Sequence, residues 1–165
     1  MALEIERRFL LKNDNWKEFI SKKVFIEQGY LSKDLDDWII RIRFTGEDFK
    51  ITFKKHIENF TSFEFEYSIP RKDGETIMSN LPNTIKKERF FLEVEKKTWI
   101  IDCFKENNYP LEIAEIELSN EKEDFSLPSF VAKEITGLKQ YLNFNLANEP
   151  FSKWKEDYLK TFKSN

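Results

Sequence analysis

Charged side chains of one sign recur two or four positions apart in six segments of the chain, and apolar residues stand between most of them. The groups are Glu4 and Glu6, Arg41 and Arg43, Lys50 and Lys54, Glu64 and Glu66, Lys87 and Arg89, and Glu115 and Glu117. Side chains two positions apart in a β-strand lie on the same face, so each segment would present like charges together. Such neighbours are mildly unfavourable on a solvated face. The repetition therefore favours a segregated electrostatic site over an ordinary sheet with one wet face.

The chemistry open to these residue types is metal and phosphate binding. Carboxylates are hard oxygen ligands for Mg²⁺, Mn²⁺ or Ca²⁺, and Lys and Arg bind phosphate oxygens through charge-assisted hydrogen bonds. His56 is the only histidine, Cys103 is the only cysteine, and the four glycines are isolated from one another. These counts exclude histidine-based triads, zinc clusters, P-loops and dinucleotide-binding fingerprints. We infer a site for a polyanion bridged to divalent cations.

The composition of the chain indicates which kind of protein contains this site. Of 165 residues, 40% are hydrophobic and 16% are aromatic, which supplies the apolar area for a folded core. The net charge of -3 gives no general reason to expect nucleic acid or an anionic membrane as a partner. No apolar run reaches membrane-spanning length, and the N-terminus is charged too early for a secretory signal. We therefore expect a cytoplasmic protein with one domain.

Most of the chain has the period-two pattern of β-strands. Strands are predicted over eight segments, at residues 2–11, 24–33, 37–45, 48–56, 62–69, 84–92, 95–104 and 112–119. Helical spacing predicts a helix over 13–22, where Trp16, Phe19 and Ile20 share a face, and a short helix over 75–81. The segment 133–163 is predicted to be mostly helical, with an interruption at Pro150.

Eight antiparallel strands tend to close into a barrel, which converts one face of the sheet into a lumen. We therefore predict an α+β fold, namely a closed eight-stranded antiparallel β-barrel with flanking helices. The charged pairs would then line the lumen, where acids and bases could act on one ligand.

At these same residues the sequence resembles the CYTH superfamily, the triphosphate tunnel metalloenzymes. The opening segment Glu4–Leu10 (EIERRFL) is similar to the ExExK signature of that family. Further similar segments follow in order: Gln28–Leu31, Arg41–Arg43, Ile51–Lys54, Glu64–Tyr67, Lys87–Phe90, Trp99–Asp102, Ala114–Leu118, Lys133–Gly137 and Tyr141–Asn143. The similarity runs from residue 2 to about 151, the expected barrel, and leaves a C-terminal helix at about 152–163 within a single domain over 1–165.

The resemblance implies a tunnel that is open at both ends and that holds a metal-dependent active site. Carboxylates would bind Mg²⁺ or Mn²⁺, and these would be Glu4, Glu6, Glu115 and Glu117, assisted by Asp102 and by Glu64 or Glu66. Cations would bind a triphosphate, and these would be Arg8, Arg41, Arg43, Lys54, Lys87, Arg89 and Lys133. Tyr30 and Lys87 would handle protons.

Two positions depart from the family pattern. Arg8 stands where the signature has lysine, and Ser62 stands where relatives often have arginine, shortly before Glu64 and Glu66. Arginine keeps the positive charge and binds phosphate well, but it does not release a proton at working pH. Serine removes one cation, which bears on the strength or specificity of anion binding.

Three functions are compatible with such a site. The first is metal-dependent hydrolysis of a triphosphate, with inorganic tripolyphosphate as the expected substrate. The second is adenylate cyclisation of the class IV type, in which a ribose hydroxyl replaces water as the nucleophile. The third is a non-catalytic tunnel that binds polyphosphate or nucleotide, although a pure anion binder gains nothing from aligned acids. We expect a small-molecule substrate, neither nucleic acid nor membrane as partner, and a monomer or homodimer.

Overall fold

The computed structural model describes residues 3–32 and 34–158. These residues form one nine-stranded sheet. Its strands are β1 (Leu3–Leu11), β2 (Ile20–Tyr30), β3 (Ile39–Phe44), β4 (Phe49–Glu58), β5 (Thr61–Ile69), β6 (Thr84–Val94), β7 (Lys97–Phe104), β8 (Glu112–Glu117) and β9 (Val131–Glu134). The helices are α1 (Arg71–Ser79) and α2 (Asn143–Asn148), with short 3-10 turns η1 (Asn15–Phe19), η2 (Glu106–Asn108), η3 (Lys139–Tyr141) and η4 (Phe151–Lys153).

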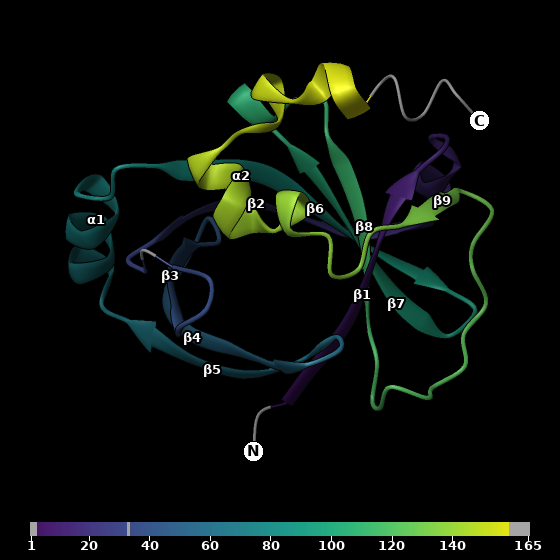
Figure 1. Cartoon of the computed structure of the whole chain (residues 1–165), viewed down its shortest axis with the longest axis horizontal. Helices are drawn as coiled ribbons and strands as arrows, with labels where there is room; N and C mark the ends of the chain where they lie inside the picture. Colours follow the sequence, from purple (N-terminus) through teal and green to yellow (C-terminus); the bar gives the residue numbers. More distant parts are fainter. Residues whose placement is uncertain (1–2, 33, 159–165) are drawn as a thin grey trace.

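Eight of the strands close on themselves, which confirms the predicted antiparallel barrel (Figure 1). The strand order is β5-β4-β3-β2-β6-β7-β8-β1-β9, and an additional pairing of β5 with β1 closes the ring. The closing pairs include Leu3 with Phe63 and Glu4 with Ser62. β9 lies outside the ring as an extra strand on β1.

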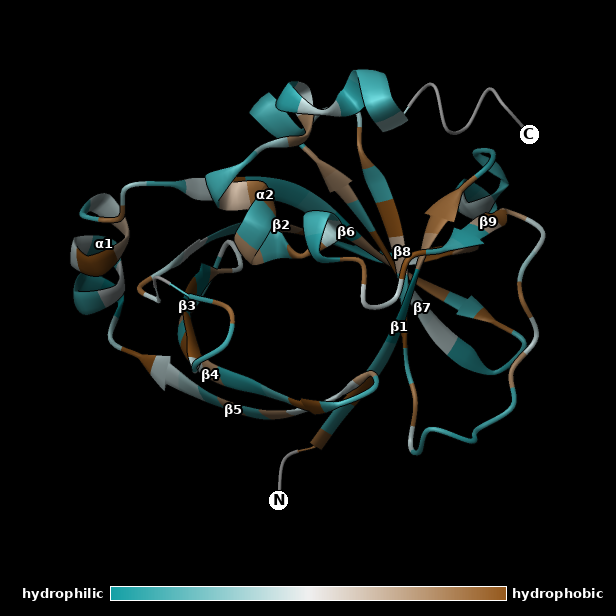
Figure 2. Cartoon of the chain, viewed as in Figure 1, coloured by the Kyte–Doolittle hydropathy of each residue, from teal (hydrophilic) through white to brown (hydrophobic). Residues whose placement is uncertain are grey.

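Strand register brings the predicted charged positions onto one face of the barrel wall. Directly opposed residues of neighbouring strands point to the same side of a sheet. Arg8 opposes Glu115 across β1 and β8, and Arg89 opposes Asp102 across β6 and β7. The same face continues around the ring through further opposed pairs, which are Gln28 with Arg43, Tyr30 with Arg41, Thr52 with Glu66, and Lys54 with Glu64. Hydrophobic residues are interleaved with these along the strands (Figure 2).

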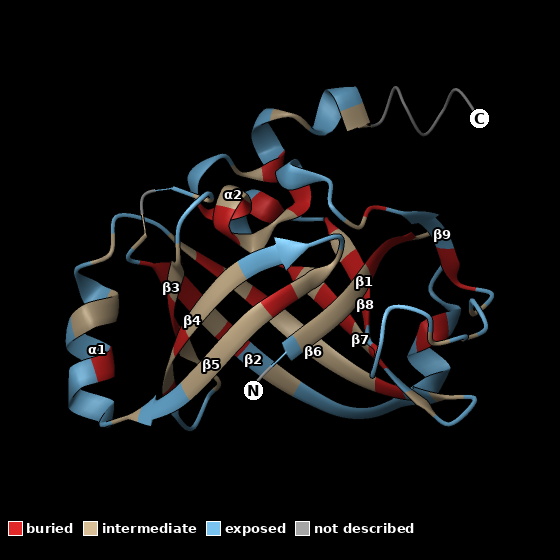
Figure 3. Ribbon diagram, turned by 60° about the horizontal axis from the view of Figure 1, so that its bottom comes forward, coloured by how far each residue is buried: buried red, intermediate tan, exposed pale blue. Residues whose placement is uncertain are grey.

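Two separate apolar cores lie against the barrel wall, one outside it and one inside it. The outer core covers the outside of β7, β8 and β1, where Trp16, Trp99 and Phe130 are each at most 1% exposed. The inner core fills the lumen near α2, where Leu10, Phe104 and Ile113 pack with Phe144 and other residues of the capping segments. Figure 3 shows buried residues of α2 lying against this end of the barrel. Apolar side chains therefore pack together at the end of the barrel near α2.

The predicted helix over 13–22 is wrong in extent. Only Asn15–Phe19 is helical, as η1, and Ile20 already begins β2, which pairs with β6 from Leu92 onward. Burial of Trp16 against Phe90, with ring centroids 5.1 Å apart, anchors this short turn on the outer core. The spacing of Trp16, Phe19 and Ile20 resembled that of a longer amphipathic helix. The short turn is instead stabilised by the packing of Trp16 against the barrel.

The predicted helical segment 133–163 is wrong at its start. Residues Val131–Glu134 form β9, which pairs with β1 through Phe9 opposite Glu134. Short helical turns then follow in η3, α2 and η4, and residues 155–158 are helical. The rest of the predicted C-terminal helix, 159–163, lies outside the described residues.

Helix α1 spans Arg71–Ser79, a few residues earlier than the predicted 75–81. It lies so close to the barrel that a Cβ atom at Gly74 would stand within 2.2 to 2.5 Å of atoms of Phe49. No helix within residues 3–32 and 34–158 is long and apolar enough to cross a membrane.

Candidate active site

An acidic group of side chains lies where β1, β4 and β5 meet. The ammonium of Lys54 forms an ion pair with Glu4, and its Nζ lies 3.4 Å from Glu6 Oε1 and 3.7 Å from Glu64 Oε2. We call Glu4, Glu6, Glu64 and Lys54 the acidic cluster. Three carboxylates thus converge on one cation, and Glu64 Oε2 is buried without a hydrogen-bond partner within residues 3–32 and 34–158.

Electrostatics separates the two carboxyls that β1 contributes to the acidic cluster. Burial and the neighbouring charge of Glu6 raise the pKa of Glu4 to about 8, against the opposing effect of Lys54. Burial acts in the same direction on Glu6, but Lys54 and Arg8 outweigh it and lower the pKa of Glu6 to about 2. One carboxyl therefore keeps its proton near neutral pH while its neighbour is ionised, as expected for two acids that share a site.

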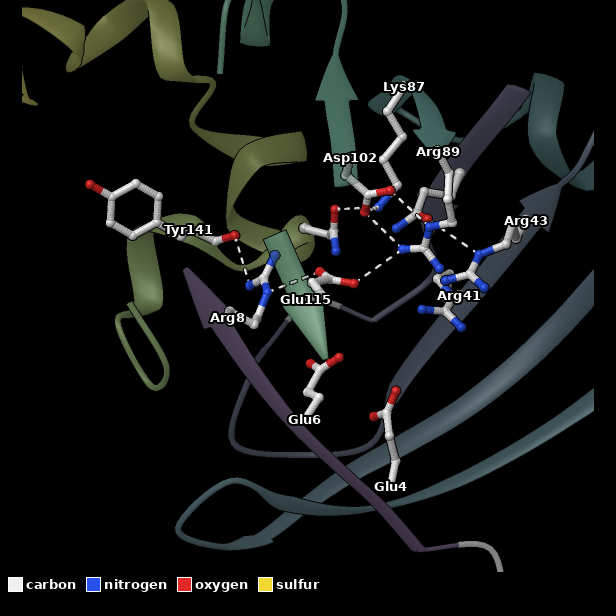
Figure 4. A network of polar contacts seen from close by, with 12 residues as sticks. Glu4, Glu6, Arg8, Arg41, Arg43, Lys87, Arg89, Asp102, Glu115 and Tyr141 are labelled. Carbon is white, nitrogen blue, oxygen red and sulfur yellow. Dashed lines mark hydrogen bonds and ion pairs between the residues drawn. The ribbon is translucent and has the colours of Figure 1, made fainter. Parts of the chain in front are cut away.

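A basic group lies across the lumen on β6, β7, β8 and the second half of β1. Asp102 accepts hydrogen bonds from Lys87 Nζ at 2.5 Å and from Arg89 Nε and Nη2 at 2.8 and 2.7 Å (Figure 4). Glu115 accepts from Arg89 Nη2 at 3.3 Å and from Arg8 Nε at 3.0 Å. We call these five residues the basic cluster, because three cations share two carboxylates.

Arg8 is held on two sides and keeps one donor free. Besides its bond to Glu115, its Nη1 donates to the backbone carbonyl of Tyr141 at 3.0 Å. Its Nη2 is buried and has no hydrogen-bond partner among the described residues. A buried unpaired donor on a cation costs free energy unless a ligand satisfies it. The guanidinium is therefore oriented by the protein while one N–H edge stays available.

Lys87 is the cation of the basic cluster whose pKa is lowered toward neutral pH. Its side chain is 0% exposed. Burial lowers its pKa to about 8, helped by Arg89 and Arg43 and opposed by Asp102. The pKa of Asp102 lies well below its usual range, because Arg89 and Lys87 outweigh the effect of burial. A lysine with such a pKa can exchange a proton near neutral pH, as proton handling requires.

A pair of arginines on β3 completes the wall between the two clusters. Arg41 Nη2 donates to Thr52 Oγ1 at 3.0 Å and lies 3.4 Å from Glu66 Oε2. Glu66 also accepts from Lys50 Nζ at 2.9 Å. Burial, together with Arg41 and Arg89, lowers the pKa of Arg43 to about 10. Cations therefore outnumber acids here, which leaves capacity for an anion.

Tyr30 lies at the inner end of the lumen. Its ring packs edge-on against Phe144 at 5.3 Å, and its hydroxyl accepts a hydrogen bond from Gln28 Nε2 at 2.6 Å. Burial raises its pKa, although Arg41 and Arg43 oppose this. A phenol in this state keeps its proton at neutral pH, so it can donate a hydrogen bond but is a poor base.

Three of the predicted or singled-out positions lie at the margins of the site. Glu117 opposes Glu6 in register but is exposed at the end of β8. Lys133 is exposed on β9 and lines a surface cavity of about 160 Å³ with Leu10 and Tyr141, so the structure does not bring it into either cluster. Ser62 is a lumen residue, 7% exposed, opposite Glu4 on one side and His56 on the other.

Several polar residues of the lumen were not predicted as site residues. They are Gln28, Thr52 and Asn143, which contact Tyr30, Arg41 and Lys87 respectively. Strand alternation could have identified two of them, since Gln28 shares a face with Tyr30 and Thr52 lies between Lys50 and Lys54. Alternation does not mark Asn143, because this residue comes from a short helix that only the fold places against the barrel.

The carboxylates suit a hard divalent metal in chemistry, although Lys54 now lies among them. No three metal-ligating side chains within the described ranges are arranged as a metal site as they stand. Glu4, Glu6 and Glu64 nevertheless surround a cation, the Lys54 ammonium, and one of their buried oxygens has no hydrogen-bond partner. Oxygen donors gathered on a positive charge fit Mg²⁺ or Mn²⁺ if that ammonium moves to another anion.

Comparison with known proteins identifies a relative along nearly the whole sequence. The chain is 35% identical over 158 residues to the inorganic triphosphatase of Acetivibrio thermocellus, covering 94% of this chain and 100% of that protein. No protein-family model matches the chain.

Solved structures show the same architecture. The crystal structure of the inorganic triphosphatase NE1496 has a TM-score of 0.65 and 27% identity, covering 89% of this chain and 95% of its own. A putative adenylate cyclase from Bacillus halodurans has a TM-score of 0.56 at 17% identity, covering 73% of this chain and 84% of its own, which is a likeness of fold alone.

Proposed function

The chain belongs to the inorganic triphosphatases of the CYTH superfamily, and from this premise we propose that it hydrolyses inorganic tripolyphosphate with the help of Mg²⁺ or Mn²⁺. One observation supports the lumen as the place of this reaction. The lumen divides its charges, with three carboxylates around one lysine in the acidic cluster and three cations around two carboxylates in the basic cluster. A phosphate chain bridged to a metal needs both kinds of partner close together.

The acidic cluster is where the metal would be held. Glu4, Glu6 and Glu64 would supply the ligands, with Glu117 opposite Glu6 within the same face. A bound Mg²⁺ or Mn²⁺ supplies charge neutralisation on the phosphate oxygens. Lys54 would then leave the carboxylates and pair with the phosphate chain, which offers it an equivalent negative charge.

The cations bind and orient the phosphate chain. Arg8 offers its free Nη2 from a guanidinium that Glu115 and Tyr141 hold in place. Arg41, Arg43 and Arg89 add positive charge along the wall, which stabilises the negative charge on the phosphate oxygens in the transition state of phosphoryl transfer. Water attacks the terminal phosphorus in line with the bond that breaks, and the products are orthophosphate and pyrophosphate.

Proton movement falls to Lys87 in this proposal. Its pKa of about 8 leaves a fraction of the amine neutral at working pH, which can take a proton as water attacks. Tyr30, with its raised pKa, stays a proposed hydrogen-bond donor at the inner end of the site. Both roles are proposals that mutation can separate.

The decisive experiment is product analysis with three substrates. The purified protein is incubated with tripolyphosphate, ATP or thiamine triphosphate under Mg²⁺ or Mn²⁺, and products are separated by ion-exchange chromatography. We expect orthophosphate and pyrophosphate from tripolyphosphate, lost in Glu6→Gln and kept in Glu47→Gln, a matched change at an exposed turn. Pyrophosphate with a cyclic nucleotide from ATP would instead indicate a cyclase, and tight binding without turnover would indicate a binding module.

A further inference from the structure

Helix α2 begins with an asparagine whose side chain does not serve the helix. Asparagine near a helix N-terminus usually bonds to free backbone N–H groups. At α2 no side chain caps the N-terminus, and Asn143 Oδ1 instead accepts a hydrogen bond from Lys87 Nζ at 3.1 Å. The polar group of Asn143 is therefore directed to the basic cluster.

The other two asparagines of α2 behave differently. Asn145 Nδ2 donates to the backbone carbonyl of Lys139 at 2.7 Å, and Asn148 Nδ2 donates to the carbonyl of Phe144 at 3.0 Å. Both bonds are local and hold the capping segment together. Among these three asparagines, Asn143 is the one whose side chain bonds to a predicted site residue, so structural support of the helix does not explain its contact.

The contact of Asn143 fixes the direction of the Lys87 ammonium. Lys87 has three N–H donors, and Asp102 accepts one of them at 2.5 Å. With that bond alone, the tetrahedral ammonium could rotate about the axis from Nζ to Asp102. The second bond, to Asn143, stops this rotation and leaves the third N–H with one direction. Asp102 is not free to accept a second hydrogen bond from the Lys87 ammonium, because Arg89 already donates to both of its carboxylate oxygens.

The same capping segment also restrains a second cation of the basic cluster. The carbonyl of Tyr141, two residues before Asn143, accepts from Arg8 Nη1 at 3.0 Å. Two neighbouring contacts from one segment therefore reach Arg8 and Lys87, which come from opposite sides of the basic cluster. The segment does more than fill the barrel end, since it bonds to the groups that would face the phosphate chain.

We propose that Asn143 is a positioning residue that orients Lys87 for phosphate chemistry. The inference rests on the proposed function, because it assigns Asn143 a role in the same site. Asn143 does not itself need to touch the substrate.

Three variants test this role. Asn143→Leu keeps the size and removes the acceptor, Asn143→Asp keeps the size and an oxygen acceptor, and Asn145→Leu is a control for support of α2. Steady-state kcat and KM on tripolyphosphate with Mg²⁺ are measured together with thermal melting. We expect Asn143→Leu to lower kcat by about tenfold or more, as for the loss of a hydrogen bond to a charged group, with a smaller rise in KM. Asn143→Asp should recover most of kcat, and Asn145→Leu should keep the wild-type kcat.

The outcomes separate the inference from the proposed function. A kcat of Asn143→Leu equal to that of the wild type, or an Asp variant as slow as the Leu variant, would overturn the positioning role. An equal loss in Asn145→Leu that follows a lower melting temperature would also overturn it. A wild type without turnover contradicts the proposed hydrolysis, and calorimetry of tripolyphosphate binding to the metal-free variants then decides the role. In that assay Asn143→Leu should bind more weakly than Asn143→Asp, and equal affinities would overturn the inference.

Discussion

The acidic and basic clusters use the same residue types in opposite proportion. In the acidic cluster three carboxylates share the ammonium of Lys54, whereas in the basic cluster Arg8, Lys87 and Arg89 share two carboxylates. The first has an excess of negative charge and the second has an excess of positive charge. The difference teaches that one lumen can favour opposite charges at two places, with the acidic cluster suited to a cation and the basic cluster suited to an anion.

Disrupting the acidic cluster should have the largest effect. Glu6→Gln removes a proposed metal ligand, a carboxyl whose pKa of about 2 keeps it ionised at working pH. We expect a loss of activity of at least about a hundredfold, because charge neutralisation by a metal is worth several kcal/mol. EDTA should abolish wild-type activity, and excess Mg²⁺ should restore it. The assay is orthophosphate release from tripolyphosphate, with circular dichroism to check that the variant folds. Full activity in EDTA would contradict the proposal that the acidic cluster acts through a bound metal ion.

Substitutions at Arg8 test the basic cluster. Arg8→Ala leaves Glu115 without one partner and removes the free Nη2, so we expect a loss in kcat/KM of about a hundredfold. Arg8→Lys keeps the charge but cannot reach Glu115 and the Tyr141 carbonyl together, so we expect only about a fivefold loss. The comparison requires kcat and KM for all three proteins. A nearly inactive wild type that Arg8→Lys activates would mean that arginine here marks a weakened enzyme.

Lys54→Met sharpens the contrast by removing the cation that now lies among the acids. Without tripolyphosphate, the variant should bind Mn²⁺ about tenfold more tightly than the wild type, because no ammonium competes for the carboxylates. Its melting temperature should fall in EDTA and recover with Mn²⁺, since the metal relieves repulsion between the acids. Calorimetry and thermal melting measure both effects. Lys55→Met, the neighbouring lysine on the outer face, is the control and should change neither.

The remaining prediction concerns pH. The pKa of Glu4 is about 8, so its carboxyl is protonated at neutral pH. A metal ion must displace this proton before the carboxylate can bind it. Metal affinity should therefore rise as pH increases from about 6 to about 8, by at most about tenfold per unit, and level off above the pKa. Calorimetry in buffers of different ionisation enthalpy would detect the released proton. In Glu4→Gln the dependence should vanish, and a wild type whose affinity is flat over this range would contradict the assignment.

The sequence predicted the barrel wall well because strand alternation is a local signal. Every second residue of a strand faces the lumen, so the pairs on β1, β3 and β5 could be assigned from the order of residues alone. The α+β class and the closed antiparallel barrel followed from the same pattern. The sequence also predicted that Glu64 and Lys54 face the lumen. It did not predict that Lys54 would lie among three carboxylates. Such sharing depends on the order of strands around the ring.

The parts that failed depend on contacts between distant segments. The sequence predicted that a helical region begins at residue 133, where the structure has β9. The strand forms because Glu134 pairs with Phe9, and the local sequence pattern does not reveal a contact between residues so far apart in the chain. Lys133 matched a family motif, yet it faces a surface cavity on the far side of the inner core. Asn143 is a single polar residue without a periodic partner. Its importance becomes visible only when α2 is placed on the barrel.

The closure of the ring at β1 sets an order in which the two clusters can assemble. β1 carries Glu4, Glu6 and Arg8, and its partners β5 and β8 begin at Thr61 and Glu112. Pairing across such separations is slow, because the loop between the strands must be ordered first. On the ribosome the acidic cluster needs only the strands up to β5, whereas the basic cluster waits until β8 has emerged. A nascent chain would therefore acquire its capacity for cations before its capacity for phosphate.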